Sequence, residues 1–325
     1  MTFIRRAMKV LMWGLLILLL TVVGGHYYWS QPKTDYPVIN ITIQTRLADK
    51  VKETSSLALL NGQIWTTNDS GDRANLYQIN ALTGLVVKQV NIAGVGSYDW
   101  EALAQDENKL YVIDCGNNKG TRKSRSIISV ESLALLAAED GGKLAASGVD
   151  RFTMADKPQQ SLTMFFHDYD CEAATVVGDQ LWIFSKNWVD FKSRRYSLDL
   201  VNLTGNVSAL TSLPELPPVQ ALEPQQELDV AGLITAADFN AVTGQLALLG
   251  YSENLIYKQP FIWLVPVQDK QVDWQQARRF NLAPYGQWES IAWRGDHELL
   301  VTAEAAWGDA GRFGVVELGL FTTLD

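Results

Sequence analysis

The sequence predicts an all-β fold, a single β-propeller of five blades that follows an N-terminal transmembrane helix. Short apolar or alternating runs separated by Gly, Asn and Asp recur along most of the 325 residues, which is the pattern of strands. Five segments repeat one layout. A separate apolar run near the N-terminus follows basic residues, as in membrane signals.

The composition excludes several classes of protein. Hydrophobic residues make up 47% and charged residues 19% of the chain, which excludes a disordered or low-complexity protein. Two cysteines are too few for a disulfide-dense miniprotein or a four-cysteine zinc site. The net charge of −9 argues against a nucleic-acid partner.

Residues 1–29 are predicted to be an uncleaved signal anchor. Basic residues precede an apolar run, and the stretch from Met8 to Trp29 approaches the roughly 20 residues that span a membrane. A cleaved signal peptide and a buried core helix are the alternatives. The positive-inside rule then predicts a single-pass protein of a bacterial inner membrane, with its propeller on the periplasmic or extracellular side. Residues 30–37 form a linker, and residues 38–325 form the propeller.

Each of the five units has a small-residue strand, a turn, an aliphatic-aromatic strand, a polar loop and a third strand. The units start at Ser55, Asp99, Asp170, Asp229 and Gln287. A fourth strand follows after Gly84, Gly148, Gly205 and Gln276. Four antiparallel strands per unit, repeated every 40–60 residues or so, are typical of propeller blades.

The strand that begins at Val38 is expected to pair as the outer strand of the last blade. Such a closure would remove the exposed edges of an open array. A sixth blade could occupy the longest gap, although residues 132–146 resemble a helical insertion there. A β-sandwich or a two-domain all-β protein would also be compatible with strands of this kind, but the repeat favours the propeller.

Propeller geometry predicts where the polar residues gather, because the start of the first strand lies beside the end of the second on one face. The aligned positions are Ser55, Glu101, Glu172, Ala231 and Glu289. Polar residues at first-strand starts are Glu53, Asp99, Glu101, Asp170, Glu172, Asp229 and Glu289. Those at second-strand ends are Asn68, Asp69, Asp72, Asp114, Asn117, Asn118, Lys186, Asn187, Glu253 and Glu304. We expect the carboxylates to converge on one mouth of a central channel.

Three kinds of partner could compensate the repulsion between these carboxylates. A hard cation such as Ca²⁺ suits several carboxylate oxygens, and the predicted metal ligands are Asp99, Glu101, Asp170, Glu172 and Glu289. Loop cations are the second kind, namely Arg73, Lys119, Arg122 and Lys186. Backbone N–H groups are the third, in which case the carboxylates are structural. A small ligand at the mouth would contact Asn68, Asp69, Asp72, Asp114, Asn118, Arg122, Lys186 and Glu304.

Three smaller features belong to the same mouth. The segment from Asn68 to Asp72 has calcium-loop residues but suits a tight turn, with Gly71 at positive φ. Cys115 and Cys171 are expected at the top of adjacent blades, where a disulfide could form. His167 is a weak candidate for a general acid or base, and a structural role is the alternative.

Several stretches of the chain resemble a family of uncharacterised exported bacterial β-propellers, often labelled WD-repeat-like. The matching stretches are IWTTNDSGD, DWEALA, LYVIDCGNN, HDYDCEA and ESIAW. This family lies near the propellers described as esterase-like phytases, and that label implies phosphate esters and calcium. The family pattern more often has Asp-Ile-Gly-Asp-Asn, whereas Cys115 and Asn117 stand here, which weakens a metal site carried over from the family.

The function predicted is that of a membrane-tethered binding or scaffold module that acts through its acidic channel mouth. A metal-dependent esterase or phosphoesterase is the alternative. The chain has no Gly-x-Ser-x-Gly, His-Glu-x-x-His, P-loop or Rossmann glycine pattern. An envelope protein is a further expected partner, and the small ligand is not identified by the sequence.

Overall fold

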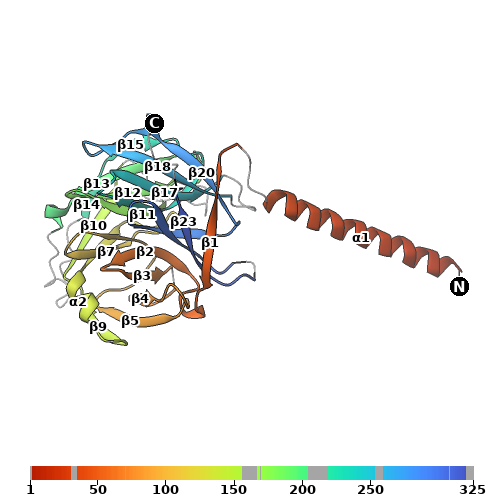
Figure 1. Cartoon of the computed structure of the whole chain (residues 1–325), viewed down its shortest axis with the longest axis horizontal. Helices are drawn as coiled ribbons and strands as arrows, with labels where there is room; N and C mark the ends of the chain where they lie inside the picture. The colour runs from red at the N-terminus through yellow and green to blue at the C-terminus, as the bar shows by residue number, and fades with distance from the viewer. Residues whose placement is uncertain are drawn as a thin grey trace.

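The computed structural model describes residues 2–30, 35–69, 71–155, 167–168, 170–203, 219–252, 259–306 and 308–319. The helix α1 (Thr2–Ser30) precedes a β-rich body (Figure 1). Within the described residues, no helix combines the length and the apolar character required to cross a membrane. This finding contradicts the predicted transmembrane helix and the predicted single-pass location in an inner membrane.

The body is all-β, as predicted, and the strands of the described residues form five units of four antiparallel strands each. Unit one contains β2 (Thr54–Leu60), β3 (Gln63–Asn68), β4 (Asn75–Ile79) and β5 (Val86–Ala93). Unit two contains β6 (Trp100–Gln105), β7 (Lys109–Asp114), β8 (Arg125–Glu131) and β10 (Gly148–Met154). Unit three contains β11 (Asp170–Val177), β12 (Gln180–Lys186), β13 (Ser193–Asp199) and β15 (Pro224–Leu228). Unit four contains β16 (Leu233–Asn240), β17 (Gln245–Tyr251), β18 (Pro260–Gln268) and β20 (Arg278–Ala283). Unit five contains β21 (Trp288–Arg294), β22 (Glu298–Ala303), β23 (Arg312–Glu317) and β1 (Val38–Arg46).

The first strands of the units, which we call the inner strands, contact one another in cyclic order. β2 contacts β6, β6 contacts β11, β11 contacts β16, β16 contacts β21, and β21 contacts β2. Five hydrophobic clusters lie between successive units, including one between unit five and unit one.

The second strands are apolar on both faces because a neighbouring unit covers each face. On β7, Leu110 and Val112 pack towards unit one, whereas Tyr111 and Ile113 pack towards unit three. All four side chains are buried. This explains the continuous apolar runs in the second strands, where a half-exposed strand would alternate.

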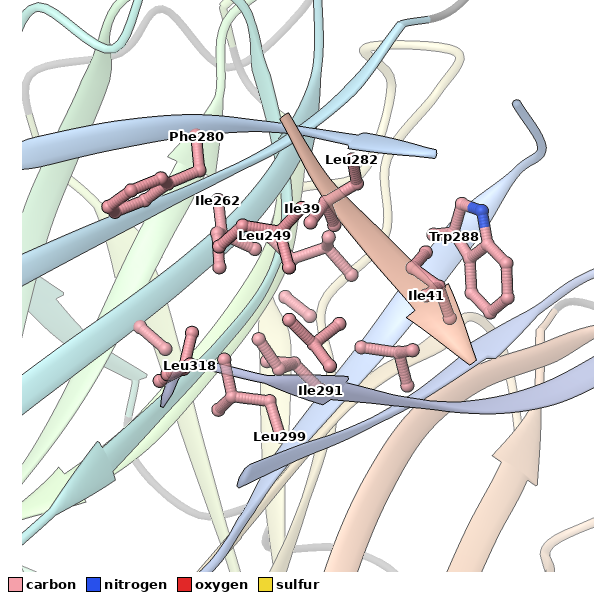
Figure 2. Close-up of a cluster of buried hydrophobic side chains, with 14 of the residues drawn as sticks. Ile39, Ile41, Leu249, Ile262, Phe280, Leu282, Trp288, Ile291, Leu299 and Leu318 are labelled. Atoms are coloured by element: carbon pink, nitrogen blue, oxygen red, sulfur yellow. The ribbon is translucent and has the colours of Figure 1, made fainter. Parts of the chain in front are cut away.

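β1 connects units four and five, and its pairing within unit five confirms the predicted outer strand. Residues 38–40 pair in parallel with β20, and residues 41–46 pair antiparallel with β23. Ile39 and Ile41 alternate with exposed residues and insert into the cluster between the two units (Figure 2). Burying such side chains stabilises the junction by roughly 2 kcal/mol each.

The same kind of crossing occurs at two other junctions. β9 (Gly142–Ala145) pairs in parallel with β5 of unit one, just before the chain enters β10 of unit two. β14 (Val219–Leu222) pairs in parallel with β10, just before β15 of unit three. Each crossing covers part of an outer edge and links adjacent units.

The remaining elements are short. The predicted insertion at residues 132–146 contains α2 (Ser132–Ala137) and then β9. The 3-10 helices are η1 (Asp49–Val51), η2 (Leu200–Asn202) and η4 (Trp274–Gln276), and β19 (Gln271–Val272) pairs with β18. The fourth strands predicted after Gly84, Gly148 and Gln276 are present as β5, β10 and β20. The one predicted after Gly205 lies outside the described residues, and β15 is the fourth described strand of unit three.

Candidate functional site

Every inner strand contains a β-bulge near its start, where the register against the second strand shifts by one residue. The residues left unpaired are Ser55, Glu101, Glu172, Thr235 and Glu289. A bulge redirects one side chain and is common beside functional sites. Four of these residues are the aligned positions of the sequence, but unit four has Thr235 in place of the predicted Ala231.

The two hydroxyl residues at the bulges link neighbouring inner strands. Ser55 Oγ donates to the carbonyl oxygen of Trp100 at 2.8 Å, and Thr235 Oγ1 donates to that of Trp288 at 3.2 Å. Each acceptor directly precedes a bulge glutamate. The hydroxyls are therefore structural, and the three glutamates are the bulge residues with charge.

A second set of residues lies at or just past the ends of the second strands. Each of them directly follows the residue that pairs with the inner-strand residue just before the bulge. These residues are Asp69, Cys115, Lys186, Tyr251 and Glu304. Cys115 forms the predicted disulfide with Cys171, whose Cα atoms are 5.5 Å apart, so the disulfide prediction is confirmed. The bond joins unit two to unit three beside the central site.

Four of the bulge residues and three of this second set line a central cavity of about 160 Å³. The cavity is lined by Ser55, Asp69, Glu101, Asn118, Glu172, Lys186, Trp188, Gln287, Glu289 and Glu304. A separate space of about 10 Å³ along the inner strands lies between mostly small and aliphatic side chains such as Ala102, Ala174 and Ala236. Five of the acidic residues predicted at the mouth therefore line one cavity, namely Asp69, Glu101, Glu172, Glu289 and Glu304.

Asp69, Asp99 and Glu101 form an acidic cluster, and Asp69 and Glu101 of this cluster line the cavity. One carboxylate oxygen from each lies within 4.8 Å of the others. Glu101 is 4% exposed, and its Oε1 has no hydrogen-bond donor within the described part of the chain. Gly116 makes room for the cluster, because any Cβ there would collide with the carboxylates of Asp99 and Glu101.

The cavity changes the acidity of its carboxyl groups. Burial and the nearby Asp69 raise the pKa of Asp99 to about 8. Burial and the charges of Glu172 and Asp69 raise the pKa of Glu101 well above its usual value. Burial also raises the pKa of Glu172, despite the opposing effect of Lys186. Without a cation, the cavity therefore favours protonated carboxyl groups.

Lys186 supplies a positive charge on the other side of the cavity. Its Nζ lies 2.9 Å from Glu172 Oε1 and 5.1 Å from the centre of the Trp188 ring. Burial lowers the pKa of Lys186, but the charges of Glu172 and Glu289 outweigh burial and raise it overall. Burial and the adjacent Glu289 also raise the pKa of Tyr251. The ammonium group offsets part of the charge near Glu172.

Asp114 and Asp170, predicted as ligand or metal residues, are occupied by internal donors. Asp170 accepts from the backbone N–H groups of Asn117 and Cys171 and from Trp188 Nε1, at 2.8–3.1 Å. Asp114 accepts from the amides of Tyr98 and Asp99 and pairs with Arg122 at 2.6 Å. Both are structural in the way expected for carboxylates that bind N–H groups.

The described residues at both ends of the segment from Asn68 to Asp72 have the hydrogen bonds expected of a turn. Asp72 accepts from Arg73 N–H, Asn68 Nδ2 and the Tyr77 hydroxyl, at 2.7–3.1 Å. Gly71 has a φ of 92°, which confirms the predicted left-handed position. Asn68 and Asp72 therefore hold the turn that presents Asp69 to the cavity.

Other predicted residues have local roles. His167 Nε2 lies 3.0 Å from the carbonyl oxygen of Asn118, and His167 does not line the cavity. Arg122 bonds to the carbonyl oxygens of Gly116 and Ser124 as well as to Asp114. Glu304 and Glu289 line the cavity, and Glu304 accepts from Gln287 Nε2 at 3.2 Å.

Not every residue predicted at the mouth lies there. Glu53 and Asp229 are exposed and do not line the cavity. Glu253 lies outside the described residues. Sequence reasoning missed Gly116, Trp188 and Tyr251, although Gly116 sits in the quoted Asp-x-Gly-Asn-Asn pattern and could have been found from it.

The comparisons with known proteins do not identify a family. No family model and no curated protein match the chain, so the resemblance to exported propellers stays a prediction. Among solved structures, the hydrazine synthase of Kuenenia stuttgartiensis matches at 12% identity and a TM-score of 0.39, over 83% of this chain and 63% of that one. A hypothetical protein from Leishmania major matches at 11% identity and a TM-score of 0.45, over 87% and 91%. A computationally designed protein, Ika8, matches at 9% identity and a TM-score of 0.32, over 84% and 99%.

This chain thus spans less than two thirds of the hydrazine synthase chain. All three TM-scores are below 0.5, so these likenesses decide neither the fold nor the function.

Proposed function

We propose that the protein is a five-bladed β-propeller whose central acidic cavity binds a divalent cation, with Ca²⁺ as the expected ion. The fold part rests on the cyclic contacts of the five inner strands and on β1, which pairs with units four and five. In this proposal the protein is a cation-dependent binding module, and no catalysis is required.

One observation carries the cation site: Glu101 is buried in an acidic cavity, and its Oε1 has no donor among the described residues. A buried carboxylate without a donor costs several kcal/mol unless a proton or a cation compensates it. Asp69 and Asp99 place two more oxygens within 4.8 Å. Three carboxylates around one point suit a hard divalent cation.

The residues that would hold the cation come from units one and two. Asp69, Asp99 and Glu101 supply carboxylate oxygens, and the Asn118 side chain lines the same cavity. Ca²⁺ takes about 6–8 oxygen ligands, so water or a bound ligand would complete the set. The bound cation would supply a positive centre for an anionic or carbonyl group of that ligand.

Isothermal titration calorimetry of the purified chain with Ca²⁺ tests the site. We expect saturable binding that weakens at least about tenfold in Glu101→Gln, since a neutral amide replaces a charged ligand. The matched control is Glu107→Gln, which alters an exposed glutamate in the turn that follows β6. Thermal unfolding of each variant checks its fold. Absence of binding in the unaltered chain, or equal binding by Glu101→Gln, would refute the proposal.

A metal-dependent hydrolase of esters or phosphate esters is the second candidate. Lys186 and Trp188 favour it, because they line the same cavity as the acidic cluster. A cation and a lysine together could stabilise the negative charge that develops during ester hydrolysis. Turnover of p-nitrophenyl esters or phosphates that disappears with EDTA and in Lys186→Met would support this function. Turnover that survives EDTA would exclude it.

A further inference from the structure

A groove separate from the central cavity lies on the outer part of unit two. It has a volume of about 590 Å³. Its walls are the connector 94–98 between β5 and β6, the loop before β8, and strands β8 and β10. We call it the outer groove, and none of its residues lines the acidic cavity.

The outer groove has an apolar floor and an aromatic wall. Val95, Ile128 and Val149 supply aliphatic surface. Tyr98 is 69% exposed, and the Arg122 guanidinium lies 4.8 Å from the centre of its ring. An exposed aromatic side chain held in place by an arginine is a typical anchor for a binding partner.

The connector offers hydrogen-bonding groups that the protein itself leaves unused. The backbone N–H and C=O groups of Val95, Gly96 and Ser97 have no backbone partner within the described ranges. An extended chain with its own N–H and C=O groups would satisfy them, as in recognition by strand addition.

The charge of the outer groove differs from that of the whole protein. Arg122 is paired with Asp114 at 2.6 Å, so these two charges largely cancel. Lys123 lines the groove, is exposed, and has no ion pair in the described part of the chain. The groove is therefore locally positive on a chain of net charge −9, which favours an anionic group at this end.

We propose that the outer groove binds an extended peptide with an acidic side chain. The peptide backbone would pair with the connector 95–97, an apolar side chain would rest on Val149 and Tyr98, and a carboxylate would meet Lys123. This proposal goes beyond the cation site and does not require it. A smaller cavity of about 260 Å³, lined by Tyr98, Asp99, Asn118 and Arg122 among others, lies between the two sites.

The test is selection of a random heptapeptide phage library on the immobilised protein, in Ca²⁺ and in EDTA. We expect enriched peptides with at least one Asp or Glu beside aliphatic residues. The best peptide, made synthetically, should bind roughly tenfold or more weakly to Tyr98→Ala and to Lys123→Glu. Lys143→Glu is the control, because it alters an exposed lysine of β9 outside the groove.

Hydrogen exchange supplies a second readout. The bound peptide should slow exchange at the amides of Val95, Gly96 and Ser97. No enrichment, enrichment without acidic residues, or equal affinity for the Tyr98 and Lys123 variants would overturn the proposal. Peptide binding in EDTA would support the groove even if the cation site failed, so the two proposals can be judged separately.

Discussion

Glu101 and Asp238 are both carboxylates of inner strands, but their surroundings differ. Asp238, towards the end of β16, accepts from the amides of Phe239 and Trp293 at 3.0 and 2.7 Å, and from the Thr175 hydroxyl at 3.3 Å. Glu101 Oε1, at the bulge of β6, has no donor among the described residues. Asp238 thus links units three, four and five, whereas Glu101 Oε1 forms no such link among the described residues.

The difference teaches that donors, and not burial alone, separate a structural carboxylate from a candidate ligand. Burial raises the pKa of both groups, that of Asp238 to about 6 and that of Glu101 well above its usual value. For Asp238 the three hydrogen bonds oppose this effect, and for Glu101 the neighbouring carboxylates add to it. The pKa of both carboxyl groups is therefore raised, but donors limit the rise for Asp238 and neighbouring charges increase it for Glu101.

The largest expected effect comes from removing the structural carboxylate. Asp238→Ala should lower the free energy of unfolding by about 3 kcal/mol, because the N–H groups of Trp293 and Phe239 lose a charged acceptor. Urea denaturation followed by circular dichroism measures the loss. Asp296→Ala, at an exposed turn of unit five, is the control. Glu101→Gln in the same assay, without cations, should be no less stable than the unaltered chain. A loss equal to that of Asp238→Ala would break the comparison.

The next effect concerns the space around the acidic cluster. Gly116→Ala should weaken Ca²⁺ binding at least about tenfold and lower stability by about 1–3 kcal/mol, because the new Cβ collides with Asp99 and Glu101. Gly116 does not have a left-handed backbone conformation, so backbone strain does not contribute. The effect would come only from the contact of the new Cβ with Asp99 and Glu101. Gly96→Ala is the matched control, since a Cβ there meets open space. Normal calorimetry for Gly116→Ala would show that the cluster can move aside without loss.

The layout of the strands could be predicted from the sequence because it depends on local alternation and on the repeat. The bulge of unit four was misplaced for a physical reason. Its side chain is the Thr235 hydroxyl, which bonds to the next inner strand, so no carboxylate marked the position. The repeats were aligned in the sequence on their charged residues. The position of a bulge depends instead on the hydrogen-bond register between two strands.

The site could be predicted only as a region. The stretches Asp99-Trp100-Glu101 and Asp170-Cys171-Glu172 look alike in sequence, yet their first aspartates differ. Asp170 accepts from Asn117 N–H and Trp188 Nε1, which come from other strands and loops. Asp99 instead interacts with the carboxylate of Asp69. Long-range donors decide between a structural and a ligand role, and a single sequence does not record them.

The smallest expected effect separates the two regions by pH. The pKa of Asp99 is about 8 in the folded protein against an ordinary value of 3.8, so the folded state holds the extra proton. Its stabilising contribution is complete below about pH 4 and is lost as pH rises through about 8. The proton on Asp238 makes a stabilising contribution of the same sign, which is lost as pH rises through about 6. Between pH 6 and 8, the stability of the cation-free protein should therefore fall because of the acidic cluster.

Urea denaturation in EDTA at several pH values from 6 to 8 measures this slope. One group contributes at most about 1.4 kcal/mol per pH unit. Asp99→Asn should reduce the slope, while Glu101 and Glu172, whose pKa values are also raised, keep part of it. Asp238→Asn should leave the slope above about pH 7 unchanged, because Asp238, with a pKa of about 6, is mostly ionised there. If Asp238→Asn flattened the curve and Asp99→Asn did not, the group that titrates between pH 6 and 8 would be Asp238. The prediction that the acidic cluster causes the slope would then be wrong.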